Sequence, residues 1–312
     1  MLNMIKMDVY RMFRTKSMYV IWIILLASAL LTSFLSKIDY DAVNKEWERQ
    51  QAVESQADTD GQTVDVVNAQ DIEEQQADNS NKEQLSQQNT DNVNIGMSVE
   101  LPTEPGKKVT VMDVFFSNAQ GKFYALFLVI FAVMFATADI KSGYIKNIGG
   151  QVSQRGMLIV SRAVALALFT AITFAGIFVF QAAANMLAFK YVMWGNWREI
   201  IPYFLTELML HYAFVLICMA IAVIIKNNVI SMTLSVCLTM NIMSIVYALI
   251  DYVGNRVGLH NFNIYKYTVT GRMAMLPMNA GRDDVVSSMC VAAVFIIIML
   301  SLSSYIFQKR DI

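Results

Sequence analysis

Residues 200–225 read IIPYFLTELMLHYAFVLICMAIAVII, an almost unbroken apolar run that contains one acidic residue, Glu207, and one histidine, His211. A bilayer core about 30 Å thick is crossed by roughly 20 apolar residues in an α-helix that rises about 1.5 Å per residue. The run is long enough to cross such a core. It therefore predicts a helix that is solvated by lipid rather than by water.

Similar apolar runs lie on both sides of this one. Together they predict six transmembrane helices, at about residues 18–36, 123–138, 163–189, 200–225, 229–250 and 286–307. The chain is 56% hydrophobic and 16% charged, and its mean hydropathy is +0.44. An ordinary soluble domain is far less apolar. We therefore predict an all-α integral membrane protein.

Residues 1–17 combine apolar and basic side chains at helical spacing. One helical face collects Leu2, Ile5, Val9, Met12 and Phe13, and the basic residues are Lys6, Arg11, Arg14 and Lys16. This pattern is typical of an amphipathic helix that lies in the membrane interface. A cleaved signal peptide is the competing interpretation, because small residues at 27–29 resemble a cleavage site. The apolar run continues through Leu35, however, which is longer than a signal peptide requires.

Residues 37–120 are strongly acidic and separate the first two predicted spans. Between 50 and 94 Gln, Asn, Asp and Glu dominate and no aromatic residue occurs, so this part can bury little apolar surface. We expect a large acidic, Gln/Asn-rich extracellular insertion that is poorly packed or only conditionally helical. From 95 to 116 the sequence becomes more apolar, and we expect that part to fold against the membrane-proximal protein.

The chain contains no recognisable ATP-binding or catalytic motif. Its two Gly-Lys pairs, at 106–107 and 121–122, are not followed by Ser or Thr, so neither is a P-loop. His211 and His260 belong to no metal-binding motif, and the three cysteines are isolated in apolar stretches. A net charge of −1 provides no basic field for nucleic acid. We expect no enzyme activity, no cofactor, no metal and no nucleic-acid partner.

The distribution of Lys and Arg predicts the orientation in the membrane. If the N-terminus is cytoplasmic, the cytoplasmic side collects Lys6, Arg11, Arg14, Lys16, Lys141, Lys146, Arg155, Arg162, Lys226, Lys309 and Arg310. Short cytoplasmic segments are enriched in such residues. The bias favours both termini in the cytoplasm and the segment 37–120 outside.

The segment between the second and third predicted spans carries the most specific signal. Residues 135–148 read FATADIKSGYIKNI, and the segment continues through Gln154-Arg155-Gly156 to Ser161-Arg162. This resembles the ABC-2 class of ABC-transporter permeases, particularly those of bacteriocin-immunity and peptide-export systems in Gram-positive bacteria. In that class an acidic residue closes the second span, a G-x-x-K-N stretch follows, and a basic residue opens the third span.

The resemblance implies a function and a set of site residues. The chain would be the membrane subunit of a transporter in the bacterial plasma membrane, with a separate ATP-binding cassette ATPase and a second permease subunit, the same chain or a homologous one. Residues 139–162 would couple the spans to the ATPase, through Asp139, Lys141, Gly143, Lys146, Asn147, Arg155 and Arg162. Two features depart from the family pattern: Arg162 stands where Lys is common, and the acidic insertion is longer than in minimal members.

Several alternatives stay open at this point. The basic residues of 139–162 can instead serve only to anchor span ends and set topology. Glu207 and His211, four residues apart, share a helical face and form either a polar path for substrate or protons or an interhelical hydrogen-bond site. The outer loop 251–285 is implied by the resemblance to fold back as short helices that cap the path, although an irregular loop fits equally well.

The function most consistent with these features is transport of an amphipathic peptide or lipid-like substrate out of the cell or the membrane. A permease for ions or small drugs is an alternative within transport. A membrane sensor or scaffold, in which the acidic insertion binds a ligand and nothing crosses, is an alternative of another class.

Overall fold

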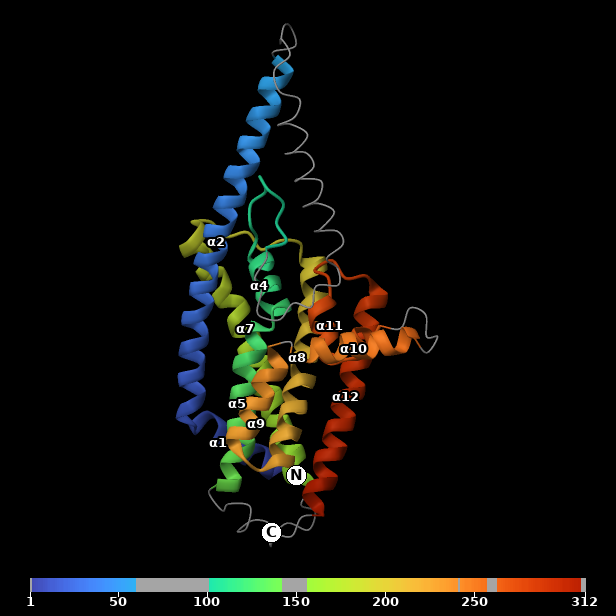
Figure 1. Cartoon of the computed structure of the whole chain (residues 1–312). Helices are drawn as coiled ribbons and strands as arrows, with labels where there is room; N and C mark the ends of the chain where they lie inside the picture. The colour runs from blue at the N-terminus through green and yellow to red at the C-terminus, as the bar shows by residue number, and fades with distance from the viewer. Residues whose placement is uncertain (1, 60–100, 142–155, 241, 257–262, 310–312) are drawn as a thin grey trace.

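The computed structural model describes residues 2–59, 101–141, 156–240, 242–256 and 263–309, and all regular elements in these parts are helical. Four helices are long and apolar enough to cross a membrane, and two bent helix pairs bring the number to six if each pair counts as one span. The chain is therefore a multi-pass membrane protein. Figure 1 shows the long helices side by side in one elongated bundle.

The amphipathic helix α1 (Leu2–Arg14) precedes the longest helix, α2 (Lys16–Thr59, 44 residues). The predicted first span at 18–36 forms only the first part of α2, which runs on into the predicted insertion. The second part of α2 rises beyond the other helices (Figure 1). Near its base the backbone N–H of Gly106 donates to Asn44 Oδ1 at 2.9 Å, and Gly106 lies against the ring of Trp47. A loop of the insertion thus packs against this helix.

The short helix α4 (Val111–Gln120) is buried along nearly its whole length. The Thr110 side chain and the Asp113 carboxylate form a capping box at its start, which satisfies two backbone N–H groups. α4 meets α5 (Phe123–Lys141) at a bend of 55°. α4 lies at the end of the predicted insertion 37–120, and its apolar side chains join the core of the bundle. α4 and α5 form one of the two bent helix pairs.

Helices α7 (Gly156–Phe189), α8 (Trp197–Ile225) and α12 (Arg282–Gln308) correspond to predicted spans 163–189, 200–225 and 286–307. α8 lies at the centre, packed against α5, α7, α9, α11 and α12. α2 packs on α7, where the indole N–H of Trp22 donates to Thr173 Oγ1 at 2.9 Å and Gln181 Nε2 donates to Ser33 Oγ at 2.7 Å. Such interhelical hydrogen bonds hold helices together where lipid gives no hydrophobic driving force.

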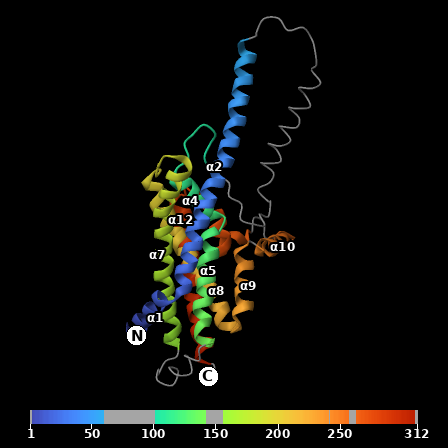
Figure 2. The same cartoon turned by 90° about the vertical axis from the view of Figure 1, so that its left-hand side faces the viewer.

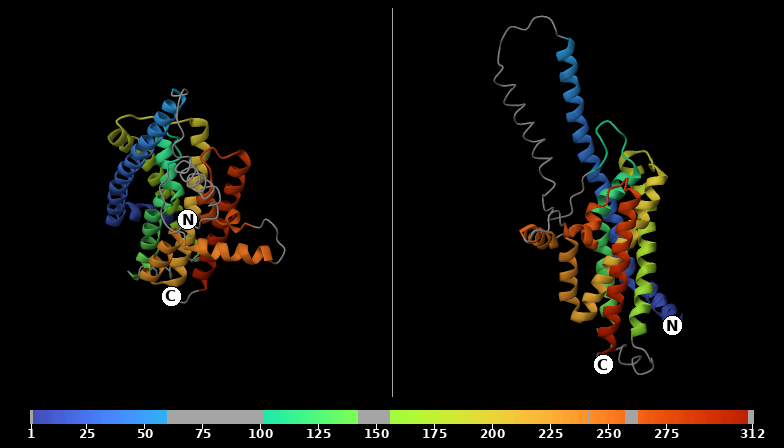
Figure 3. Two further views of the ribbon diagram at one scale, coloured as in Figure 1. Left: turned by 45° about the horizontal axis from the view of Figure 1, so that its top comes forward. Right: turned by 90° about the vertical axis from the view of Figure 1, so that its right-hand side faces the viewer.

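The predicted fifth span at 229–250 is not one continuous helix. α9 (Asn228–Thr239) and α10 (Met243–Arg256) are bent from each other by 60°. α10 projects sideways from the bundle (Figures 1 and 3). It is held in this direction because the Tyr247 hydroxyl hydrogen-bonds Thr270 at 2.8 Å and the Tyr247 ring packs edge-on against Tyr265 at 5.2 Å. Hydrophobicity alone does not reveal such long-range contacts.

The described part of the outer loop 251–285 contains two short helices, η2 (Ile264–Tyr267) and α11 (Val269–Met275). α11 packs against α8, α4 and α12. Gly271 of α11 lies so close to η2 that an added Cβ would meet the Tyr265 backbone oxygen at 2.3 Å. Glycine is therefore required for the close contact of these two helices.

Candidate functional site

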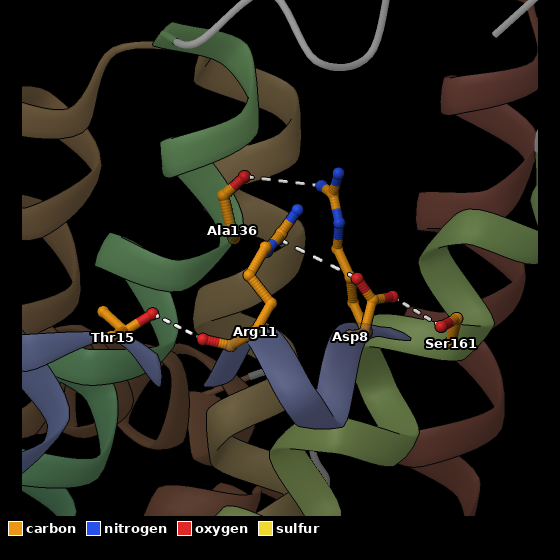
Figure 4. A network of polar contacts seen from close by, with 6 residues as sticks. Asp8, Arg11, Thr15, Ala136 and Ser161 are labelled. Carbon is orange, nitrogen blue, oxygen red and sulfur yellow. Dashed lines mark hydrogen bonds and ion pairs between the residues drawn. The ribbon is translucent and has the colours of Figure 1, made fainter. Parts of the chain in front are cut away.

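The first candidate site lies where α1 and the C-terminal end of α12 share one end of the bundle (Figures 1 and 2). α1 packs on α7. The Asp8 carboxylate of α1 is only 2% exposed and accepts a hydrogen bond from the Ser161 hydroxyl of α7 (Figure 4). Arg11 approaches the same carboxylate at 3.9 Å and lies over the Phe135 ring of α5, 5.2 Å from its centroid. An otherwise basic amphipathic helix thus places its acidic residue inside the protein.

Arg162 extends this arrangement to two further helices. Its side chain is buried, with 2% exposure, and its guanidinium donates to the Ala136 carbonyl of α5 at 3.4 Å. The guanidinium also lies over the Phe307 ring of α12, 6.0 Å from its centroid. We call Asp8, Arg11, Ser161 and Arg162 the α1 anchor. These residues connect α1, α5, α7 and α12 at one end of the bundle.

The predicted coupling residues fall partly outside the described residues. Gly143, Lys146, Asn147 and Arg155 lie in 142–155. Asp139 and Lys141 lie on the last turn of α5, and their side chains are not described. Arg162 was predicted within a polar cytoplasmic segment, but it lies inside helix α7, which begins at Gly156. Its buried guanidinium contacts α5 and α12.

The second candidate site is inside the bundle, on α8. Glu207 and His211 are both 0% exposed, and His211 Nδ1 lies 2.8 Å from the Glu207 backbone oxygen and 3.1 Å from its carboxylate Oε2. Because a carbonyl oxygen only accepts hydrogen bonds, Nδ1 carries a hydrogen. The shorter contact takes this hydrogen, and the carboxylate contact is chiefly electrostatic. Within the described residues, neither carboxylate oxygen accepts a hydrogen bond and Nε2 of His211 has no hydrogen-bond partner.

A third ionisable side chain acts electrostatically on Glu207 from another element. Lys122, at the bend between α4 and α5, is only 1% exposed and interacts electrostatically with Glu207. Its backbone φ is 59°, a left-handed conformation that costs a residue with a Cβ roughly 1–2 kcal/mol. We call Lys122, Glu207 and His211 the buried ionisable cluster. An isolated charge at the centre of a bilayer costs about 2.5–3.5 kcal/mol on insertion scales, so opposite charges are expected to lie together there.

Two aromatic hydroxyls border this cluster. Tyr203 lies one helical turn before Glu207, is 1% exposed, and interacts electrostatically with Glu207 and with Tyr124 of α5. The imidazole of His211 packs against the Phe174 ring of α7, with centroids 4.7 Å apart. The cluster therefore combines ionisable groups with a wall of aromatic rings, inside a bundle that lipid surrounds.

Two important residues were not identified from the sequence. Asp8 was overlooked, although it falls between Ile5 and Met12 on the apolar face of α1, where a carboxylate needs a buried partner. Lys122 was noted in the sequence for its Gly-Lys pair and not as a charge inside the bundle. Its position directly between two strongly apolar stretches was the available signal, but the bend that turns it inward is a tertiary feature.

Comparison with protein families matches residues 83–312 to a family model. The family is described as a protein of unknown function, DUF2705. A comparison with curated proteins gives no match.

Proposed function

The chain belongs to the DUF2705 family of unknown function, and we propose that it is the membrane-spanning permease subunit of an ABC transporter. A separate ATP-binding cassette subunit hydrolyses the ATP. A second permease subunit, the same chain or a homologous one, completes the translocation path. The proposal rests on the resemblance of residues 135–162 to ABC-2 permeases and on the helix arrangement around that segment.

The single observation that carries the proposal is the α1 anchor. The α1 anchor connects α1 and α12 to the ends of α5 and α7 that border residues 142–155. Packed helices with buried polar contacts move together rather than independently. A force applied to the connecting segment by an ATPase would therefore be transmitted directly to four helices, as switching between inward- and outward-facing states requires.

The proposed layout has six spans, with α4–α5 and α9–α10 each counted as one bent span. Both termini and residues 139–162 face the cytoplasm of a bacterial cell, and 37–120 is extracellular. Two observations support this orientation: α1 and the end of α12 share one end of the bundle, and this end carries basic residues that favour the cytoplasmic side.

The proposed substrate is an amphipathic peptide or a lipid-like molecule, moved out of the cell or the membrane. The acidic composition of 37–120 would attract cationic peptides at the outer surface. α2 supports such a role because it carries part of this segment well beyond the bundle (Figure 1).

Copurification tests the proposal. Full-length chain carrying an affinity tag is isolated from its own bacterium in mild detergent, and bound chains are identified by mass spectrometry. We expect a chain with a Walker A motif, together with ATPase activity that the isolated permease lacks. Capture of a kinase or protease without any ATPase would instead favour the sensor interpretation and overturn the transporter proposal.

A further inference from the structure

The buried ionisable cluster has more polar groups than a purely structural ion pair needs. Lys122 comes from the α4–α5 bend, whereas Glu207 and His211 come from α8. Among the described residues, the carboxylate oxygens of Glu207, Nε2 of His211 and the Tyr203 hydroxyl all lack a hydrogen-bond partner. Buried polar atoms are almost always hydrogen-bonded in folded proteins. Several buried polar atoms without a hydrogen-bond partner occur together here, which indicates a site that binds an additional chemical group.

The cluster is electrically neutral in a state that can still bind a proton. With Lys122 positive, Glu207 negative and His211 neutral, its net charge is zero. Because Nδ1 of His211 holds the hydrogen that faces the Glu207 backbone oxygen at 2.8 Å, Nε2 has a free lone pair in the neutral imidazole. Glu207 and His211 therefore offer two adjacent acceptors for one additional proton.

We propose that Lys122, Glu207 and His211 form an internal proton-binding site that controls how firmly the α4–α5 bend is held against α8. Without the proton, the negative Glu207 attracts the positive Lys122 across the two elements. A proton from water that binds a Glu207 oxygen forms an O–H bond, neutralises the carboxylate and raises the charge of the cluster from zero to +1. The attraction between the bend and α8 is then weakened.

The side chains around Glu207 determine which groups can take part in proton binding. Among the described residues, the ionisable groups that act on Glu207 are His211 on its own helix and Lys122 at the bend. Tyr203 of α8 and Tyr124 of α5 contribute phenol hydroxyls. The described parts of α7, α9, α11 and α12, which also pack against α8, contribute no charge that acts on this carboxylate. Proton uptake is therefore assigned to Glu207.

A proton site of this kind can be measured on the full-length chain alone in lipid nanodiscs, independently of transport. Infrared spectra are recorded as a function of pH for the parent and for Glu207→Gln, which preserves side-chain shape. Subtracting the spectrum of the variant from that of the parent leaves the signal of the Glu207 carboxyl group. We expect a protonated-carboxyl band that appears as the pH is lowered through a single midpoint.

The role of Lys122 is tested by a shift of that midpoint. Removing a nearby positive charge disfavours the carboxylate, so Lys122→Gln should move proton uptake to higher pH by about one unit or more. Lys122→Arg, which retains the charge, should leave the midpoint nearly unchanged. The control is Lys190→Gln, because Lys190 is exposed and has a similar left-handed backbone, with φ 64°.

Hydrogen exchange tests the mechanical consequence at one fixed pH above the measured midpoint, where Glu207 of the parent is ionised. Glu207→Gln imitates the protonated state, so the α4 amides of this variant should exchange several-fold faster than those of the parent. Glu199→Gln, on the exposed start of α8, should have no effect. The proposal is overturned if the Glu207 carboxyl band is absent, or constant, between about pH 4 and about pH 10. It is equally overturned if Lys122→Gln leaves the midpoint unchanged or if α4 exchanges at the parent rate in Glu207→Gln.

Discussion

The Asp8 carboxylate on α1 accepts a hydrogen bond from the Ser161 hydroxyl on α7, although the two residues are 153 positions apart. This contact adds a buried polar link to the packing of α1 on α7. Arg162, the next residue on α7, contacts α5 and α12. The helix α1 is thus an integral part of the bundle.

Replacing Asp8 by Ala should loosen α1. The substitution removes the acceptor of the Ser161 hydroxyl and the carboxylate beside Arg11, and loss of a buried hydrogen-bond partner costs about 1–3 kcal/mol. We expect a lower Tm of the purified chain and faster hydrogen exchange in α1. Asp41→Ala is the matched control, because Asp41 forms an exposed ion pair with Lys37. Its loss should lower the free energy of unfolding by less than about 1 kcal/mol. Equal effects of the two substitutions would contradict the assigned role of the α1 anchor.

Replacement by Ala is expected to have opposite effects on stability at two glycines. At Gly271 an added methyl group would meet the Tyr265 backbone at 2.3 Å, whereas at Gly176 of α7 it would meet nothing within 4 Å. Gly271→Ala should therefore push α11 away from η2 and destabilise the protein by about 1–3 kcal/mol. Gly176→Ala should be neutral or slightly stabilising, since Ala favours a helix. Thermal unfolding in nanodiscs measures both, and a similar Tm for the two variants would contradict the close packing.

The sequence predicts the long helices well and their interruptions poorly. Predicted spans at 163–189, 200–225 and 286–307 lie within α7, α8 and α12, because each is an uninterrupted apolar run that hydrophobicity alone identifies. The break after α9 was missed because flanking residues on both sides are apolar. What turns α10 aside is its contact with Thr270 and Tyr265, which are far along the chain.

The candidate sites were predicted less completely than the fold. The pairing of Glu207 with His211 follows from their spacing of four residues on one helix. Lys122 could not be added from spacing, since it reaches Glu207 only through the bend between α4 and α5. Arg162 was recognised as an important basic residue, but its burial between α5 and α12 depends on how three helices pack.

The proposed orientation places residues 142 and 86 on opposite sides of the membrane, so cysteines introduced there should differ in their accessibility from outside the cell. With Cys290, the exposed native cysteine, first replaced by Ser, Ser142→Cys and Ser86→Cys are introduced one at a time. An impermeant thiol reagent applied to intact cells should label the cysteine at 86 and should reach the one at 142 only after permeabilisation, because basic segments stay in the cytoplasm. Labelling at 142 in intact cells would invert the proposed topology.

Charge reversal in the connecting segment tests the coupling itself. Lys146→Glu combined with Arg155→Glu should reduce transport strongly while the helices remain inserted. The reason is that both positions lie in the short polar segment between α5 and α7, where reversal repels an acidic partner surface and typically costs a few kcal/mol of binding. Transport of a labelled cationic amphipathic peptide and binding to the copurified ATPase are measured in the same variant.

A change of topology is the main alternative explanation for a loss of transport in that double variant, because it also weakens the positive-inside signal. The thiol-labelling assay at 142 and 86 excludes this when it is repeated in the variant. Lys37→Glu is a suitable control, since Lys37 is a half-exposed residue of α2 in an exposed ion pair with Asp41. If the double variant inserts correctly, binds the ATPase as tightly as the parent and transports normally, residues 139–162 do not couple the spans to the ATPase.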